Sequence, residues 1–465
     1  MGAGRMPRKQ AFLLIGIVAL VAAIGWFAWE HYGPDRSYDE AYDRTTELAL
    51  QGRDAACVKV WRQYTHRNPE DPAGHIYLAA ALIRRHHYDA AEEPLARALR
   101  LDPSVAQGYL WRAHLLESRA EYLAADRDLE RGLELVARET DTDPDDAEAT
   151  ATRALLLAAS DEWGAAGSAA DRALDAHPDH MVLRLTRIRI LTEQGAFDEA
   201  IEHCDRLLAE HPDAAYVLMM RGAVRDYAGE PRAAMEDLTR ALEINPDYDH
   251  ALMRRAWLAI DEGEIARALE DSDRALEANE RSGWAWFVRG SAFVESMRWE
   301  NAPDWAQDGY VLAWIYYYRQ KRHARRHLER AIEIDPYAAA AHVALAEMLT
   351  WSGDYSEARP HARKAIDLYT AKIEAREPAT KDYLWRASAY ITVRDYTNAR
   401  SDLQEALEVA ESSTEREYAE RWLDYVDEVD PSGAATGSGG TVPEPAPTEA
   451  PYPKSEEKAE GKGLR

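Results

Sequence analysis

The sequence predicts an all-α protein, built as a long stack of helical hairpins, and three observations predict this fold class. The chain has 465 residues, and its middle is rich in alanine, leucine, glutamate and arginine, which favour helices. A short string ending in proline recurs along it. Small residues also recur at fixed places relative to these prolines. A chain of this length with internal repetition is expected to form a repeat array rather than one compact domain.

The first element expected along the chain is a membrane anchor. Arg5, Arg8 and Lys9 belong to a basic segment over residues 1–10, and an uncharged apolar run over 11–29 follows it. Nineteen helical residues extend about 28 Å, close to the hydrocarbon thickness of a bilayer. We therefore expect a transmembrane helix over 11–29, with the basic segment in the cytoplasm. The repeats would then lie in the periplasm, or outside, of a bacterial-type inner membrane.

A cleaved signal peptide is the alternative for this segment. The small residues Val21, Ala22 and Ala23 follow an apolar core of suitable length, and cleavage there would release a soluble secreted or periplasmic protein. The apolar run continues from Ile24 to Trp29, however, and cleavage would leave a hydrophobic new N-terminus. An uncleaved anchor is the favoured interpretation.

The repeat is visible in four similar strings: LARALRLDP, ADRALDAHP, LTRALEINP and LERAIEIDP. Windows of 34 residues laid out from their final prolines begin at Tyr38, Pro72, Ala106, Ala147, Met181, Ala215, Asp249, Gly283, Trp305, Ala339 and Thr380. The eighth place of a window holds glycine or alanine in Ala79, Ala113, Ala154, Gly222, Ala256, Gly290, Ala346 and Ala387. The twentieth place holds alanine in Ala91, Ala125, Ala166, Ala200, Ala234, Ala268, Ala302, Ala324, Ala358 and Ala399.

These small residues have a physical purpose, because they allow the two helices of a hairpin to approach closely. Proline at place 32 ends the second helix. A glycine often falls between the two helices, where a positive φ is tolerated, and the glycines so placed are Gly52, Gly195, Gly229, Gly263 and Gly353. We expect repeats over 38–139 and 147–413, separated by an insertion.

This pattern resembles the tetratricopeptide repeat, and the likeness covers roughly residues 38 to 413. The resemblance implies a right-handed α-solenoid that binds a peptide or helix of another protein. It also implies that the first helix of each hairpin lines the concave groove, mainly through places 2, 5, 9, 12 and 13. The groove residues carried over in this way are Tyr216, Met219, Tyr227, Met253, Trp257, Trp284, Phe287, Tyr316, Tyr317 and Trp351.

Other interpretations of these groove residues remain open. The aromatic side chains could instead pack between neighbouring repeats, and the solenoid could chiefly self-associate. Binding of the acidic tails of chaperones is disfavoured, because the family members that do this place lysine, asparagine and arginine in the groove. An enzyme domain hidden within residues 299–319 is also disfavoured, because that stretch is too short to house an independent site.

No catalytic constellation, cofactor motif or metal-binding motif stands out in the sequence. His323 and His327 have a chelating spacing, but the basic stretch around them, residues 319–330, favours a solvated helix face. Asp141, Asp143, Asp145 and Asp146 lack the glycine and distal glutamate of an EF-hand and indicate an acidic linker. The formal net charge of −27 argues against nucleic acid as a partner. Cys57 and Cys204 are expected to be buried, unpaired thiols.

The repeat pattern is irregular in three places. Residues 139–146 form an insertion, a shorter one precedes Thr380, and the window at Gly283 is cut short before Trp305. After the last window, residues 414–430 suit a capping helix, which the end of a solenoid requires. The tail over 431–465 is rich in glycine, proline, serine, threonine and glutamate, so it is expected to be disordered.

Overall fold

The structure is a computed structural model that describes residues 37–143, 146–298, 310–376, 378–410 and 413–430. In this part of the chain, 21 α-helices follow one another and there is no strand. None of the described helices has the length and apolarity needed to span a bilayer. The anchor expected over 11–29 and the tail over 431–465 lie outside the described residues.

The helices form ten consecutive antiparallel hairpins. Their first helices are α2 (Tyr38–Leu50), α4 (Pro72–Arg84), α6 (Ala106–Glu117), α8 (Ala147–Ala159), α10 (Met181–Glu193), α12 (Ala215–Tyr227), α14 (Asp249–Asp261), α16 (Gly283–Ser296), α19 (Ala339–Trp351) and α21 (Thr380–Val393). Their second helices are α3 (Asp54–Arg67), α5 (Tyr88–Leu101), α7 (Tyr122–Thr142), α9 (Trp163–Ala176), α11 (Phe197–Glu210), α13 (Pro231–Ile244), α15 (Ile265–Ala278), α18 (Tyr310–Ile334), α20 (Tyr355–Ala375) and α22 (Tyr396–Val409). A last helix, α23 (Ser413–Val429), follows them.

Close packing at the two small places explains why these residues form hairpins. The described alanines at places 8 and 20 have no exposed surface. A Cβ added to Gly222 would lie 3.1 Å from Cγ of Leu238, and one added to Gly290 would lie 2.7 Å from Cγ of Leu328. A larger side chain at either place would push the two helices apart, so the expected reason for the pattern is confirmed.

In nine of the ten hairpins the turn has one residue in the left-handed conformation at place 15; in the eighth, Met297 stands at this place with a φ of −76°. All five glycines expected there have positive φ, between +69° and +80°. Four other hairpins place His86, Ala120, Asp161 and Arg394 in the same conformation, with φ between 56° and 65°. Because a side chain is strained at positive φ, these four turns are held by the hairpin around them rather than by local preference.

The insertions lengthen helices. Helix α7 continues to Thr142 and α20 to Ala375, so each is 21 residues long where most second helices have 14. The windows drawn at Gly283 and Trp305 are a single hairpin, because α18 packs along α16 as its second helix. Leu328 of α18 packs into the space beside Gly290 of α16. Treating Trp305 as the start of a separate first helix was therefore wrong.

Both ends of the array are closed by aromatic side chains. Tyr418 and Trp422 of α23 are 6% exposed and pack against Leu403 and Ala406 of the last hairpin. This helix stands where the capping helix was expected. At the other end, Trp61 of α3 is 2% exposed and stacks on Tyr77 of the next hairpin, with ring centroids 4.9 Å apart.

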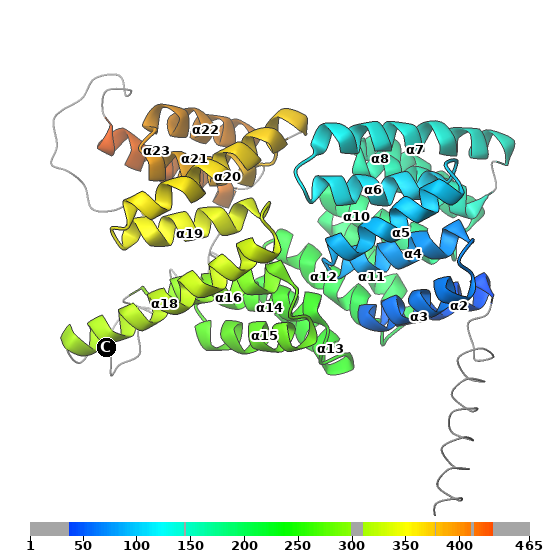
Figure 1. The fold of residues 1–465 in the computed structure, drawn as a ribbon, viewed down its shortest axis with the longest axis horizontal. Helices are drawn as coiled ribbons and strands as arrows, with labels where there is room; N and C mark the ends of the chain where they lie inside the picture. The colour runs from blue at the N-terminus through cyan, green and yellow to red at the C-terminus, as the bar shows by residue number, and fades with distance from the viewer. Residues whose placement is uncertain (1–36, 144–145, 299–309, 377, 411–412, 431–465) are drawn as a thin grey trace, which may run out of the picture.

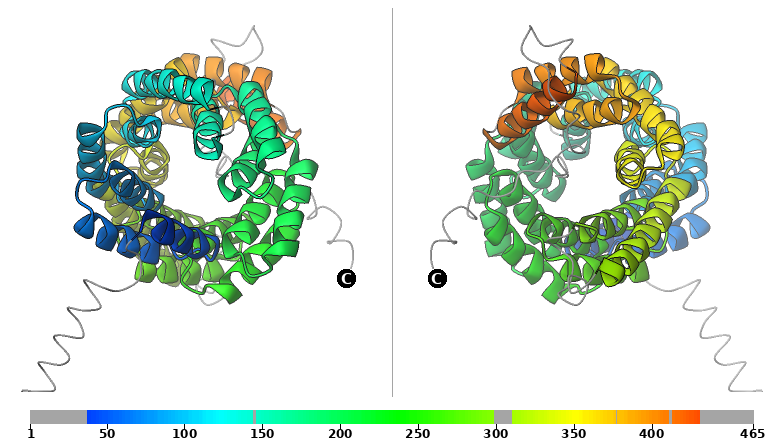
Figure 2. Two further views of the ribbon diagram at one scale, coloured as in Figure 1. Left: turned by 90° about the vertical axis from the view of Figure 1, so that its right-hand side faces the viewer. Right: turned by 90° about the vertical axis from the view of Figure 1, so that its left-hand side faces the viewer.

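The array is curved, with its first helices on the inside. Successive first helices contact one another from α4 through α10 and from α12 through α21, whereas second helices contact mainly the first helices on either side. Viewed along the long axis, the hairpins wind around a common centre (Figure 2). Figure 1 shows the first and last hairpins at opposite ends of the long axis.

One turn of the coil rests on the next. Asn245 donates to the backbone carbonyls of Gln51 and Gly52, at 3.1 and 3.0 Å. Asn279, which is 34 residues later, donates in the same way to the carbonyl of Arg85 at 3.1 Å. We call this set of contacts the seam. It joins residues 51–54 and 84–87 of the first two hairpins to residues 245–250 and 278–279 of the sixth and seventh hairpins.

Candidate functional site

The candidate site lies on the first helices of the middle hairpins, which carry most of the predicted groove residues. Its centre is an aromatic cluster formed by Trp257 of α14 with Trp284 and Phe287 of α16. Trp257 stacks on Phe287 with ring centroids 5.7 Å apart, and Trp284 lies 5.9 Å from Trp257. Successive first helices pack side by side, which brings places 9, 2 and 5 of adjacent windows together.

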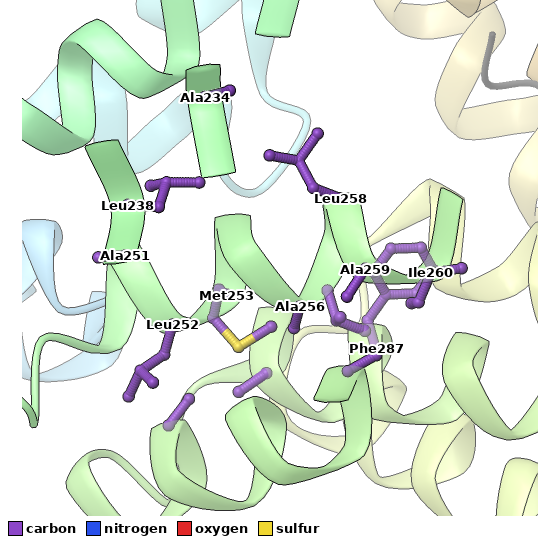
Figure 3. Packing of buried hydrophobic residues seen from close by; sticks show 14 of the residues in the cluster. Ala234, Leu238, Ala251, Leu252, Met253, Ala256, Leu258, Ala259, Ile260 and Phe287 are labelled. Atoms are coloured by element: carbon purple, nitrogen blue, oxygen red, sulfur yellow. The ribbon is translucent and has the colours of Figure 1, made fainter. Parts of the chain in front are cut away.

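These three rings differ in how much surface they offer. Phe287 is 3% exposed and belongs to the central core, together with Met253 at 2%. Figure 3 shows both side chains among the buried alanine, leucine and isoleucine side chains of that core. Trp284 is 40% exposed, although it packs on two other rings. The cluster therefore presents one large indole on a rigid aromatic base.

The remaining groove residues flank this cluster in different ways. Tyr216, Met219 and Trp351 are partly buried against the same core, whereas Tyr227 is 53% exposed at the end of α12. Each of these residues comes from a first helix, as the resemblance implied. Met253 and Phe287 are therefore buried in the core, and the guanidinium of Arg84 lies over the ring of Tyr216, 5.6 Å from its centroid.

Tyr316 and Tyr317 lie elsewhere in the hairpin. They belong to the N-terminal part of α18, which is a second helix, because the separate window expected from Trp305 does not exist. The hydroxyl of Tyr317 is nevertheless 3.3 Å from Oγ of Ser352, the residue after Trp351. The extra length of α18 thus brings this tyrosine next to the predicted groove by another route.

A second cluster on the first hairpins was missed by the sequence analysis. The hydroxyls of Tyr38 and Tyr77 donate to one carboxylate oxygen of Glu148, at 3.3 and 2.5 Å, and Gln107 donates to the same oxygen at 3.1 Å. Tyr42 packs edge-on against Tyr77, with centroids 5.5 Å apart. The residues come from four successive first helices. The signal was present, since three tyrosines occupy the first helices of the first two windows.

Two carboxyl groups on the first helices have unusual proton affinities. Burial raises the pKa of Asp226, beside Tyr227, to about 6, although Arg254 opposes the shift. Burial also raises the pKa of Glu347 to about 7; the hydroxyl of Ser388 donates to this carboxylate, and the nearby Glu295 raises the pKa further. Both groups therefore change charge near neutral pH.

His323 and His327 were expected to lie on a solvated helix face. They pack against aromatic rings instead. Phe293 stacks on both, with centroid distances of 5.0 and 5.2 Å, and His327 is buried. Nε of Arg289 donates to Nε2 of His327 at 3.2 Å, so that nitrogen is already an acceptor. Burial, with Arg289 as the next cause, lowers the pKa of His327 to about 4.

A possible metal-ligand group, Asp54, Asp249 and His250, lies at the seam, with its ligand atoms within 4.8 Å of one another. Each side chain already contacts a protein group. Arg84 forms an ion pair with Asp54, Asn279 donates to Asp249 at 3.2 Å, and Nε2 of His250 is 2.7 Å from the carbonyl of Arg84. The guanidinium supplies the positive charge, so these groups are best explained as a polar contact between two turns of the coil.

One residue of the predicted acidic linker caps the start of a helix. Asp146 is the N-cap of α8, and its carboxylate accepts from the backbone N–H groups of Glu148 and Ala149 at 2.9 and 3.0 Å. Cys57 and Cys204 are buried free thiols, as expected, and burial raises the pKa of each to about 12. Neither thiol is accessible as a nucleophile.

The fold and this inner face define a solenoid of helical hairpins, the class of protein whose repeats present a curved surface. Three segments, residues 157–224, 253–314 and 383–413, match models described as tetratricopeptide repeat. The chain is a tetratricopeptide-repeat protein. Such repeats are typical of scaffolds for protein–protein interaction. No curated protein matches the chain.

Several solved structures are similar to this one. A tetratricopeptide repeat protein from Parabacteroides merdae is 18% identical, with 60% of this chain and 98% of that chain covered and a TM-score of 0.42. Human IFIT1, solved as a dimer with m7Gppp-AAAA, is 16% identical, with 86% and 88% covered and a TM-score of 0.48. A thermophilic repeat protein of the same kind from Thermus thermophilus is 20% identical, with 44% and 95% covered and a TM-score of 0.36.

Proposed function

We propose that this protein is a non-catalytic scaffold, tethered to the membrane by its N-terminal segment, that binds a partner protein on the inner face of its middle hairpins. The partner would lie there as an extended peptide or a helix. The observation that carries the proposal is Trp284, a residue of a first helix that is 40% exposed while it packs on Trp257 and Phe287. A large ring that is both held in place and exposed is the usual anchor of a protein interface.

The strength of such an interaction can be estimated from its anchors. Trp284, Tyr227 and the exposed parts of Trp257 and Trp351 would each contribute about 1–2 kcal/mol. After the entropic cost of association, a few anchors of this size give micromolar rather than picomolar binding. The scaffold would therefore hold its partner reversibly.

The membrane tether is supported by the sequence alone. The apolar run over 11–29 is long enough to span a bilayer, and α2 begins nine residues after its end. Carbonate extraction of membranes, together with the mass of the purified protein, tests this part. Release into the soluble fraction, or a mass that lacks the first residues, would replace the tether with a soluble periplasmic or secreted adaptor.

The partner surface is tested with a photo-cross-linking amino acid placed at Trp284 in the full chain. We expect one protein to cross-link, and we expect the yield to fall at least tenfold when Trp257→Ala and Trp351→Ala are added. Tyr337→Ala with Tyr355→Ala is the matched control, because these rings are 42% and 47% exposed but lie outside the predicted groove set. Equal loss in the control, or no loss in the groove variant, would refute this surface.

A further inference from the structure

A hollow of about 480 Å³ lies beside the first hairpin, and no residue of the aromatic cluster lines it. Most of its wall is one face of α3, and the rest comes from the turn between α4 and α5. Its lining residues are Ala55, Val58, Lys59, Arg62, Gln63, His66, Arg67, Arg85 and His87. Four of these are cations, two are histidines, and none is a carboxylate. In a chain with a formal net charge of −27, such a lining is unexpected.

The spacing of α3 concentrates this charge. Lys59, Arg62 and His66 are three and four residues apart, so they share one face of the helix, and all three are exposed. Lys59 and Arg62 form no ion pair with any residue in the described ranges. Their charges remain available to a ligand.

The opposite wall is fixed by the seam. Nη2 of Arg85 donates to the carbonyl of Ala278 at 3.1 Å, and Nε2 of His87 is 3.0 Å from Oδ1 of Asn279. Burial lowers the pKa of His87, and the charges of Arg85, Arg281 and Arg62 lower it further. Several cations therefore act on the same small volume, and one wall cannot easily move away.

We propose that this hollow binds a phosphate-bearing anion, and that the headgroup of an anionic phospholipid is its source. Guanidinium and ammonium groups form short, charge-assisted hydrogen bonds to phosphate oxygens. The volume lies within the range of small-ligand pockets, and Ala55 and Val58 give it an apolar floor.

The position of the hollow in the chain favours a lipid as that source. Helix α2 begins nine residues after Trp29, and an extended segment of that length reaches at most about 30 Å. The first hairpin is therefore the part of the array that the anchor would hold nearest to the bilayer. The choice of a lipid rests on the proposed membrane tether, whereas binding of the anion does not.

The test is calorimetric titration of the full chain in a neutral detergent with three probes. These are inorganic phosphate, dihexanoyl phosphatidylglycerol and the zwitterionic dihexanoyl phosphatidylcholine. We expect heat of binding from phosphate and from phosphatidylglycerol above the level of phosphatidylcholine. In the variant Lys59→Gln, Arg62→Gln, both affinities should fall at least tenfold. The control variant Arg172→Gln, Arg206→Gln removes two exposed cations from α9 and α11, and should bind like the parent.

Each outcome decides one part of the proposal. Unchanged affinity in the Lys59, Arg62 variant, an equal loss in the control, or no binding of either anion would overturn the site. Phosphate binding that the variant weakens, with phosphatidylglycerol no better than phosphatidylcholine, would support the anion site and refute the lipid source. Because carbonate extraction tests the anchor separately, failure of the tether is distinguishable from failure of this site. Unchanged helical circular dichroism shows that each variant is folded.

Discussion

Arg255 and Asp271 form a bidentate ion pair inside one hairpin, with Nε and Nη2 each 2.7 Å from a different carboxylate oxygen. Asp271 is 1% exposed. The same pair, between places 7 and 23, recurs in three other hairpins as Arg112–Asp128, Arg221–Asp237 and Arg386–Asp402. In these four hairpins it joins the first helix to the second, in addition to the close packing at places 8 and 20.

Removing one partner of this buried pair should destabilise the repeat strongly. We expect Asp271→Ala to lower the free energy of unfolding by about 3–5 kcal/mol, because the guanidinium of Arg255 loses its partner while half-buried. Denaturant unfolding of the full chain, followed by circular dichroism, measures the loss. Glu333→Ala, which removes the exposed partner of Arg330, is the control and should have little effect. Similar losses in both variants would contradict this assignment.

The eighth hairpin has the arginine of this pair, Arg289, but not the aspartate, and this difference gives a second prediction. His327 stands at the place that holds aspartate in the other four, and its neutral ring accepts from Arg289 at 3.2 Å. Replacing it by aspartate should add a second carboxylate beside the arginine, which already forms an ion pair with Asp273. We expect His327→Asp to stabilise the protein by about 1–3 kcal/mol, since hydrogen bonds to charged groups are the stronger kind.

The control for this substitution is His327→Asn, which offers an uncharged acceptor of similar size. Thermal unfolding of both variants at pH 7 makes the comparison. A lower midpoint for the aspartate variant than for the asparagine variant would show that Phe293 and Trp286, which pack on His327, matter more than the charge of Arg289.

The hairpins could be predicted from the sequence because the residues that determine each hairpin lie close together in the chain. Small residues at places 8 and 20, prolines at place 32 and glycines such as Gly229 each act within one window, so matching residues predict matching structure. The Arg255–Asp271 pair is equally periodic, but arginine and aspartate are common on exposed helix faces. Nothing in the residue types alone distinguishes a buried pair from two solvated charges.

The contacts between distant windows could not be predicted. The seam brings Gln51 to Asn245 because curvature accumulates over several repeats, and a small error in each repeat would change the partner. Because of the insertion after Met297, the repeat pattern did not reveal the second helix of the eighth hairpin. Tyr316 was therefore assigned to a first helix. Within the candidate site, the helix was predictable for Trp257 and Trp284, but the burial of Met253 and Phe287 depended on neighbours that periodicity does not identify.

Strain at place 15 gives a third prediction. Ala120 has a φ of 58°, where alanine costs about 1–2 kcal/mol and glycine costs almost nothing. Replacing this alanine by glycine would relieve the strain, but the greater freedom of glycine in the unfolded chain offsets part of the stability gained. We therefore expect Ala120→Gly to stabilise the protein by about 0.5–1 kcal/mol in thermal unfolding. Ala137→Gly, within α7, should instead destabilise it by a similar amount. Loss of stability in both variants would mean that the turn carries no such strain.

The buried carboxyl of Glu347 gives a pH-dependent prediction. Burial raises its pKa to about 7, above the ordinary value of 4.5, so between these values the folded state holds a proton that the unfolded state has released. Its contribution to stability is therefore present below pH 4.5 and is lost as the pH rises through 7. We expect Glu347→Gln to raise the unfolding midpoint at pH 8 and to have little effect at pH 4.5. An equal change at both pH values would show that the proton is not responsible.

The seam gives the last prediction, because two equivalent asparagines hold one turn of the coil against the next. Asn245 contributes two hydrogen bonds to backbone carbonyls, and Asn279 contributes one to a carbonyl and one to Asp249. The double variant Asn245→Ala, Asn279→Ala leaves every hairpin intact but removes these bonds. We expect unchanged helical circular dichroism, a larger radius of gyration in small-angle scattering, and faster amide exchange around residues 49–53 and 82–88. Asn398→Ala, at an exposed helix start, is the control. If the radius of gyration of the double variant equals that of the control, the asparagines are not needed, and the remaining seam contacts of Tyr248, Arg85 and His250 are sufficient to keep the coil closed.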